Sequence, residues 1–280
     1  MTTIAETLKS ATQTLSRHSE SPRLDAELLL GKATGLSRPS LIARADECVA
    51  QDAASAYANL ISQRVKGTPV AYLTGRSEFW SLPLAVTPAV LVPRPETETL
   101  VEQALRLKSR TAHCAVLDLG TGSGAIALSL AAERPHWRIT GVDRSPEALK
   151  VAALNSQALD LTHVQWQLGN WFDGVSGRRF DLIVANPPYI AASDPALERL
   201  AAEPLMALTS GPTGLEALSA IIVNAPRYLH AGGWLLLEHG SSQAKDVSDL
   251  LEQRGFKMIR TVQDIAGRPR ITLGSVHTQH

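Results

Sequence analysis

The chain has 280 residues, of which 44% are hydrophobic and 19% charged, so it can bury the cores of one or two domains. Its 27 lysines and arginines balance 27 aspartates and glutamates, which disfavours extended binding to nucleic acid or to anionic membranes. The two cysteines, Cys48 and Cys114, lack the spacing of a disulfide framework or a zinc site. No stretch approaches the roughly 20 apolar residues of a membrane span, and the N-terminus has no signal-peptide pattern. We therefore expect a cytoplasmic protein without a membrane anchor.

The N-terminal region, about residues 4–66, has the spacing of amphipathic helices. Apolar residues recur three and four positions apart, and Gly31, Gly35 and Pro39 interrupt the pattern. This pattern predicts a small helical domain over residues 1–75.

A short region of β character follows the helical pattern. Strand-like runs occur at Glu78–Trp80 and Leu84–Thr87, in a stretch that prolines punctuate repeatedly. We interpret residues 76–95 as a β-hairpin linker between two domains.

Beyond Glu96, segments typical of strands and helices alternate. Strands are predicted at Ala115–Asp118, Arg138–Val142, Val164–Leu168, Phe180–Ala185 and Trp234–Leu237, and two of the helices at Ala125–Glu133 and Leu215–Tyr228. The alternation predicts an α/β domain over residues 96–280, with a doubly wound, mostly parallel sheet. Ligands of such sheets bind beyond the carboxyl ends of the strands.

A glycine-rich loop follows the first predicted strand of this domain. It consists of Gly120, Thr121, Gly122, Ser123 and Gly124. Because a helix follows the loop, backbone N–H groups and a helix N-terminus face any ligand there. Asp143 ends the next strand, about 20 residues further on, where a carboxylate can accept hydrogen bonds from both ribose hydroxyls of a nucleoside.

The loop and Asp143 alone leave three interpretations open. Gly120, Gly122 and Ala125 also satisfy the dinucleotide fingerprint, so a nicotinamide or flavin cofactor fits them. A tight strand-to-helix turn without any ligand fits them as well. Asp118 favours the third interpretation, S-adenosylmethionine, because a carboxylate at the mouth of the loop suits the ammonium group of a methionine and would repel a pyrophosphate.

The run Asn186, Pro187, Pro188 and Tyr189 follows the predicted strand Phe180–Ala185. A strand cannot continue through two prolines, so the chain must leave the sheet at Asn186. The prolines fix the backbone so that the Asn186 side-chain carbonyl and the Pro187 main-chain carbonyl can converge on one –NH₂ group. Tyr189 then offers an aromatic face to a planar target.

This arrangement suits methyl transfer to a conjugated nitrogen. The lone pair of such a nitrogen is delocalised, and two acceptors can orient it and stabilise the positive charge that grows as the methyl group arrives. No strong base is needed, because the proton can leave after the transfer. A strand-terminating turn with a packed tyrosine also fits the four residues, but it does not account for the glycine loop at a neighbouring strand end. We predict a methyltransferase that acts on a planar amide or amino nitrogen.

Several motifs carry a resemblance to known proteins. Asp118-Leu-Gly-Thr-Gly-Ser-Gly124 with Asn186-Pro-Pro-Tyr189 resembles the class I amino-methyltransferases. Further motifs narrow the resemblance to the PrmC/HemK family, the peptide chain release factor glutamine methyltransferases. They are Pro69-Val-Ala-Tyr-Leu-Thr-Gly75, Val92-Pro-Arg-Pro-Glu-Thr-Glu98, Glu203-Pro-Leu-Met-Ala-Leu208, Leu237-Glu-His-Gly240 and Gly267-Arg268.

The resemblance implies methylation of the glutamine side-chain amide in the Gly-Gly-Gln motif of class 1 release factors. S-adenosylmethionine is the implied donor, S-adenosylhomocysteine the product, and no metal is implied. The glycine loop, Asp143 and Asn186 are then expected to bind the donor, and Trp171 to border its adenine. Asn186 to Tyr189 are expected to hold the glutamine, with Asn186, Pro187 and Tyr189 as catalytic residues. We expect a monomer that does not bind nucleic acid directly and whose helical domain recognises the release factor.

Other functions stay open at this point: glutamine methylation of a ribosomal protein, adenine amino methylation of nucleic acid, a nicotinamide-dependent oxidoreductase, or a non-catalytic nucleotide-binding module. Arg94, Glu96 and Glu98 are explained by a helix start after Pro95, where acids are favoured by the helix dipole. A structural role explains His239 equally well. We assign these charged residues no catalytic role.

Overall fold

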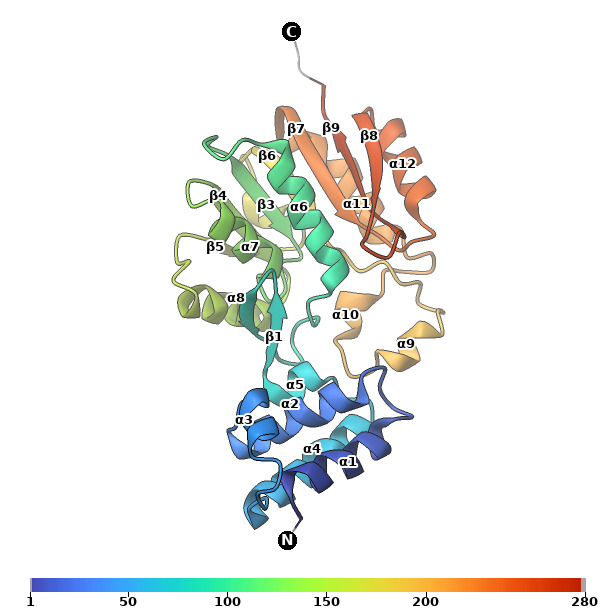
Figure 1. Ribbon diagram of the computed structural model, residues 1–280. Coiled ribbons are helices and arrows are strands. Elements are labelled where there is room, and N and C mark those ends of the chain that lie inside the picture. The colour runs from blue at the N-terminus through green and yellow to red at the C-terminus, as the bar shows by residue number, and fades with distance from the viewer. Residues whose placement is uncertain (1, 278–280) are drawn as a thin grey trace. The chain divides into compact units, whose positions relative to one another are not determined.

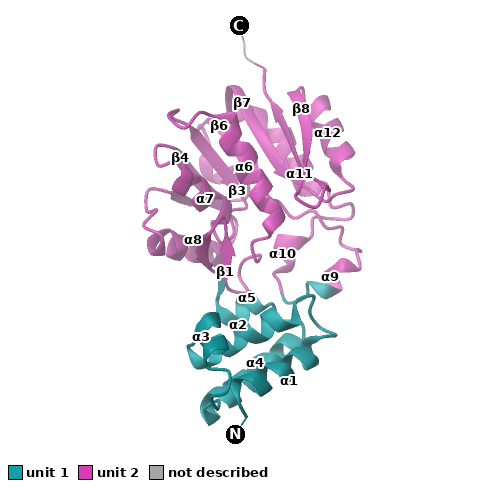
Figure 2. Cartoon of the chain, viewed as in Figure 1, with its two compact units in different colours: residues 1–76, 199–202 teal, residues 77–198, 203–280 magenta. Residues whose placement is uncertain are grey.

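The computed structural model describes residues 2–277. The chain forms two compact units, shown in different colours in Figure 2. Unit 1 contains Met1–Arg76 and Arg199–Ala202, and unit 2 contains Ser77–Glu198 and Glu203–His280. None of the helices in the described part of the chain is long and apolar enough to cross a membrane.

Unit 1 is helical, as the apolar spacing predicts. Its helices are α1 (Ile4–Leu15), α2 (Pro22–Thr34), α3 (Arg38–Ala43), α4 (Gln51–Val65) and α5 (Val70–Thr74). A capping box begins α1, because the Thr3 hydroxyl accepts from the Glu6 N–H and the Glu6 carboxylate accepts from the Thr3 N–H. Leu8, Leu29 and Leu30 are fully buried in the core of this unit.

The predicted interruption at Gly31 is wrong. Helix α2 runs through Gly31 and ends at Gly35, which adopts φ 73°. A glycine inside a helix costs only about 1 kcal/mol relative to alanine, and the burial of Leu29 and Leu30 on the same helix offsets that cost. Gly31 also permits a close approach, since a Cβ there would lie 2.9 Å from the Leu36 carbonyl oxygen.

A β-hairpin begins at Arg76, within the predicted linker, and each of its strands begins two residues before the predicted strand-like run. Its strands are β1 (Arg76–Phe79) and β2 (Leu82–Ala85). The turn residues Trp80 and Ser81 have φ 52° and 59°, the geometry of a two-residue hairpin turn that favours glycine or asparagine. The sequence gives no such signal there. Glu98 and Glu133 hold Trp80 in this conformation by accepting from its backbone N–H and its indole N–H, respectively.

The remainder of unit 2 is built on a seven-stranded sheet of order β5-β4-β3-β6-β7-β9-β8 (Figure 1). Strands β3 to β7 pair in parallel, and β9 and β8 pair antiparallel at one edge. The predicted doubly wound, mostly parallel fold is therefore confirmed. The strands are β3 (Ala115–Leu119), β4 (Arg138–Asp143), β5 (Gln165–Leu168), β6 (Phe180–Ala185), β7 (Leu229–Glu238), β8 (Lys257–Gln263) and β9 (Pro269–Ser275).

Helices cover both faces of this sheet. They are α6 (Glu98–Leu107), α7 (Ala125–Glu133), α8 (Pro146–Ala158), α11 (Glu216–Asn224) and α12 (Ala244–Gln253). Shorter helices occur in the connections: η1 (Pro95–Thr97), η2 (Asp173–Val175), α9 (Ala196–Arg199), α10 (Leu205–Leu208) and η3 (Ala225–Arg227). Successive residues of a strand point to opposite faces, so Val116 packs in the cluster with α6 and α7, and Leu117 in the cluster with α11 and α12. Burial on both faces explains the nearly continuous apolar runs of the central strands.

The topology places a crevice at the centre of the sheet. Strand β3 has β4 on one side and β6 on the other, so successive crossovers lead away from β3 in opposite directions. The loops that follow β3 and β6 therefore separate at their carboxyl ends, which is where α/β sheets bind ligands.

Candidate active site

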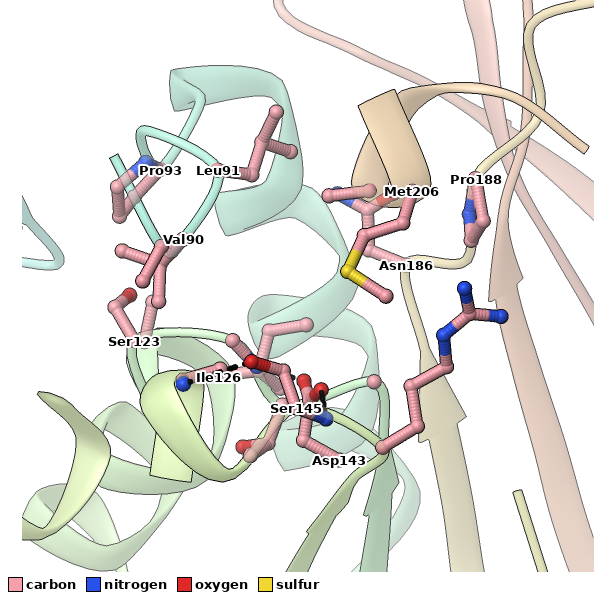
Figure 3. A pocket seen from close by; sticks show the side chains of 18 of the residues that line it. Val90, Leu91, Pro93, Ser123, Ile126, Asp143, Ser145, Asn186, Pro188 and Met206 are labelled. Carbon is pink, nitrogen blue, oxygen red and sulfur yellow. Dashed lines mark hydrogen bonds between the residues drawn. The ribbon is translucent and has the colours of Figure 1, made fainter. Parts of the chain in front are cut away.

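A pocket lies at this crevice, and every residue that lines it belongs to unit 2. Figure 3 shows Val90, Leu91 and Pro93 on one side, Asn186, Pro188 and Met206 on the other, and Asp143 and Ser145 between them. Most of the predicted site residues line the pocket: Gly120, Thr121, Gly122, Ser123, Asp143, Trp171, Asn186 and Pro188. Gly124, Pro187 and Tyr189 lie outside the lining.

The glycine loop is folded back onto strand β4. The backbone N–H groups of Gly120 and Thr121 both donate to the Val142 carbonyl, at 2.9 and 3.0 Å. Gly122 has φ 55°, and a Cβ on it would meet nothing within 4 Å. Gly124 has φ 82°, and a Cβ on it would lie 2.9 Å from the Trp166 ring. Glycine is thus required at Gly124 by packing and backbone conformation.

Asp143 is held in place at the end of β4 by two backbone donors. Its Oδ2 accepts from the Gly122 N–H and its Oδ1 from the Ser145 N–H, both at 2.9 Å. Each oxygen keeps a further lone pair for a ligand hydroxyl. Ser145 also caps α8, because its hydroxyl accepts from the Ala148 N–H at 3.1 Å.

Asp118 lies behind the loop and is fully buried. The Thr121 hydroxyl donates to its Oδ2 at 2.6 Å, and its Oδ1 has no hydrogen-bond partner within residues 2–277. Burial raises the pKa of the Asp118 carboxyl to about 7. The expectation that the Asp118 carboxylate stands at the mouth of the loop is therefore wrong: it lies outside the pocket lining and is hydrogen-bonded to Thr121, which lines the pocket.

Trp171 covers the other side of the loop. Its ring lies 3.5 Å from the position that a Cβ on Gly120 would take, and it lines the pocket. Its backbone has φ 55°, a conformation that costs free energy for a side chain of this size. The fold thus holds the indole against the glycine loop, as a flat wall for a planar group.

The Asn-Pro-Pro-Tyr run leaves the sheet at the end of β6. The Asn186 Nδ2 donates to the Thr97 hydroxyl at 3.1 Å, which leaves its Oδ1 as an acceptor for the pocket that Asn186 lines. The Tyr189 hydroxyl donates to Oε1 of Glu238 at 3.4 Å. Burial raises the pKa of Tyr189 to about 12, so its hydroxyl stays protonated.

Comparison with known proteins agrees with this geometry. Residues 6–75 match the model of the PrmC N-terminal domain, and residues 110–267 match a methyltransferase domain. The chain is 48% identical to a release factor glutamine methyltransferase of Pseudomonas aeruginosa over 277 residues, covering 98% of this chain and 99% of that protein. It is also 48% identical to the protein of the same name from Xylella fastidiosa over 254 residues, covering 90% and 92%.

The chain belongs to the release factor glutamine methyltransferase family. Among solved structures, a methyltransferase from Pyrococcus furiosus is similar in fold, with a TM-score of 0.54 and 17% identity over 70% of this chain and 89% of that one. Residues 110–267 match a methyltransferase domain, and the residues of the pocket fit S-adenosylmethionine, the donor that the sequence motifs imply. Asp143 offers carboxylate lone pairs to a ribose, and Trp171 offers a flat wall to a purine.

Sequence reasoning missed Asn155, which positions the glycine loop in this family member. Its Nδ2 donates to the Ser123 carbonyl at 2.9 Å and to the Ala85 carbonyl at 3.0 Å, and its Oδ1 accepts from the Ala85 N–H at 2.7 Å. This buried side chain thus ties strand β2 to the loop. Only the fold brings these three residues together, so no local pattern identifies Asn155.

The sequence also did not predict the apolar residues that form the walls of the pocket. Val90, Leu91 and Met206 line the pocket but carry no chemical signature in the sequence. Arg94, which was given no catalytic role, lines the pocket too and forms an ion pair with Glu203. Glu203 also accepts from the Val92 N–H at 3.1 Å, so it joins the two walls that carry Arg94 and Met206.

Proposed function

We propose that this protein transfers the methyl group of S-adenosylmethionine to the side-chain amide nitrogen of the glutamine in the Gly-Gly-Gln motif of class 1 release factors. The observation that carries the proposal is the orientation of Asn186. Its Nδ2 is bound to Thr97, and its Oδ1 is free to accept a hydrogen bond in the pocket that contains the glycine loop and Asp143.

The residues of the chain divide the work between two ligands. Asp143 and the glycine loop orient the donor, which when bound supplies an electrophilic methyl group on a sulfonium ion. The Asn186 Oδ1 and the Pro187 carbonyl each accept one N–H of the glutamine amide and direct its nitrogen to the methyl group. Both acceptors stabilise the positive charge that develops on that nitrogen. The proton then leaves to water, and S-adenosylhomocysteine remains.

The apolar walls support this chemistry. Val90, Leu91 and Met206 exclude water from the reacting nitrogen, which strengthens the hydrogen bonds to Asn186. The two glycines before the glutamine suit such a pocket, because a backbone without side chains can approach its mouth closely.

We also propose a role for each part of the chain. Residues 1–75 recognise the release factor, residues 76–95 link the two domains, and residues 96–280 carry the reaction. The reaction needs no metal ion and no nucleic acid, and we propose that the protein acts as a monomer. Because release factors act in translation, the proposed compartment is the cytoplasm.

Methyl transfer from a labelled donor to purified release factor tests the proposal. We expect label on the wild-type factor and none on a factor whose Gly-Gly-Gln glutamine is replaced by alanine. Label on ribosomal protein or on nucleic acid instead would assign one of the other methyl acceptors.

Calorimetric titration separates the classes of cofactor. We expect binding of S-adenosylhomocysteine and none of NAD. Tight binding of NAD would contradict the methyltransferase assignment.

A further inference from the structure

Glu238 is a buried carboxylate behind the Asn-Pro-Pro-Tyr run. It ends strand β7 and is 1% exposed. Its Oε1 accepts from the Tyr189 hydroxyl at 3.4 Å, and its Oε2 makes no hydrogen bond of good geometry in the described part of the chain. A carboxylate that is buried and incompletely paired lowers the stability of a fold, so its presence requires a reason other than packing.

Glu238 is connected to Asn186 and to Tyr189, the two polar residues at the ends of the Asn-Pro-Pro-Tyr run. The Tyr189 hydroxyl donates to it directly. The connection to Asn186 passes through Thr97, whose hydroxyl lies close enough to the Glu238 carboxylate to lower its pKa and accepts from the Asn186 Nδ2 at 3.1 Å. Thr97 is itself 4% exposed, so water does not compete strongly for its hydroxyl.

The proton on Thr97 decides which way the Asn186 amide faces. A hydroxyl has one proton, and an ionised carboxylate can only accept. When Glu238 is ionised, the Thr97 proton is directed to it, and the Thr97 oxygen accepts from the Asn186 Nδ2. The Asn186 Oδ1 then faces the pocket.

Protonation of Glu238 reverses the direction of the hydrogen bonds between Glu238, Thr97 and Asn186. A protonated carboxyl donates to Thr97, and the Thr97 hydroxyl then donates to Asn186, which turns its Oδ1 away from the pocket and its Nδ2 toward it. A donor would then face the –NH₂ group of the substrate, which also donates. That arrangement cannot hold the glutamine amide.

We propose that Glu238 is a positioning residue, which through Thr97 fixes the Asn186 amide with its oxygen toward the substrate. This inference rests on the proposed function, because it presupposes a substrate with an –NH₂ group. Ionised Glu238 serves the reaction at a cost in stability, and its neutral form presents the wrong face of Asn186.

The charges around Glu238 define the pH range in which it acts. Burial raises its pKa to about 7, and Glu96 adds to the rise. Thr97, Tyr189 and Arg270, on β9, oppose it. The neighbouring His239 is fully buried, and burial lowers its pKa, so it adds no positive charge there. Activity should therefore be present above pH 7 and fall as the pH drops through about 7.

The variant Glu238→Gln tests the proposal, because it keeps the shape of the side chain and replaces a carboxylate oxygen with a donor. With a release factor as substrate and saturating donor, we expect kcat/KM to fall by at least about 10-fold and its loss below pH 7 to become smaller than in the wild type. Binding of S-adenosylhomocysteine should be unchanged. The matched control is Glu133→Gln, which alters the carboxylate that accepts from the Trp80 indole, outside the pocket, and should leave activity unchanged.

A second set of variants separates positioning from a general effect on the fold. Thr97→Ser keeps the hydroxyl and should keep activity, while Thr97→Val removes it and should lose activity to the same degree as Glu238→Gln. Because both changes act on one amide, the double variant Glu238→Gln/Thr97→Val should be no worse than either single variant.

The outcomes are distinguishable from a failure of the proposed function. If the wild-type protein transfers no methyl group to the glutamine, the proposed function fails. If the wild-type protein transfers it and Glu238→Gln does so equally well, with an unchanged pH profile, the positioning role is refuted. Equal activity of Thr97→Val and Thr97→Ser would refute it independently, even if Glu238→Gln does not fold.

Discussion

The two sides of the pocket are built differently. The donor side consists of the glycine loop and Asp143, whose carboxylate is fixed by backbone N–H groups of the adjacent loops. The acceptor side consists of Asn186 to Tyr189, whose polar groups are fixed by side chains from other elements, Thr97 and Glu238. The orientation of Asp143 therefore depends on the local backbone, whereas the orientation of the acceptor residues depends on side chains from elsewhere in the fold.

We expect the largest loss of activity from a variant that alters only the acceptor side. Asn186→Ala removes one of the two acceptors of the glutamine amide, and we expect kcat to fall on the order of 10²-fold or more. S-adenosylhomocysteine should still bind to this variant, as calorimetric titration would show. Near-normal turnover would refute the acceptor role.

The corresponding change on the donor side is Asp143→Ala. It removes the carboxylate and leaves the N–H groups of Gly122 and Ser145 without their acceptor. We expect the Kd for S-adenosylhomocysteine to rise about 10-fold or more, corresponding to roughly 1–3 kcal/mol. At saturating donor, kcat should change less than in Asn186→Ala. A variant that binds the donor normally would contradict the role of Asp143.

The pH dependence of the free energy of unfolding tests the acceptor side separately, because the buried charge of Glu238 lowers the stability of the fold. Its folded pKa of about 7 lies above its ordinary value of 4.5, so its stabilising contribution is present at low pH and is lost as the pH rises through 7. Glu238→Gln should therefore match wild type near pH 4 and exceed its stability by about 1–3 kcal/mol at pH 8.5. Urea unfolding at the two pH values measures this. A variant that is less stable at pH 8.5 would contradict the cost assigned to the buried charge.

A test of the glycine loop concerns stability alone. Gly124→Ala combines φ 82° with a Cβ contact of 2.9 Å to Trp166, and we expect a loss of about 2–3 kcal/mol. The control is Gly35→Ala at the end of α2, where φ is 73° but nothing lies within 4 Å of the Cβ. It should cost only about 1 kcal/mol. Equal losses in urea unfolding would show that the contact with Trp166 carries no energy.

The features that the sequence could predict are those that depend on neighbouring residues in the chain. The apolar runs that became β3, β4 and β6 are buried on both faces, so their pattern identified them and placed the glycine loop, Asp143 and Asn186 at their ends. The family motifs gave the reaction class. These features are local in the sequence, and the structure and the comparisons confirm the fold and the family.

Features that depend on distant partners were not predictable. The hairpin turn at Trp80 requires positive φ without glycine, and Glu98 and Glu133 supply its support. Asn155 binds Ser123 only because α8 packs beside the loop, and Thr97 reaches Asn186 only because η1 lies beside the end of β6.

Tandem mass spectrometry of the Gly-Gly-Gln peptide, after incubation of a release factor with this protein and S-adenosylmethionine, decides whether the glutamine is the methyl acceptor. We expect one added methyl group, located on the side-chain nitrogen of the glutamine. An unmodified glutamine, obtained with protein that binds the donor, or a methyl group on any other residue of the factor, would contradict it.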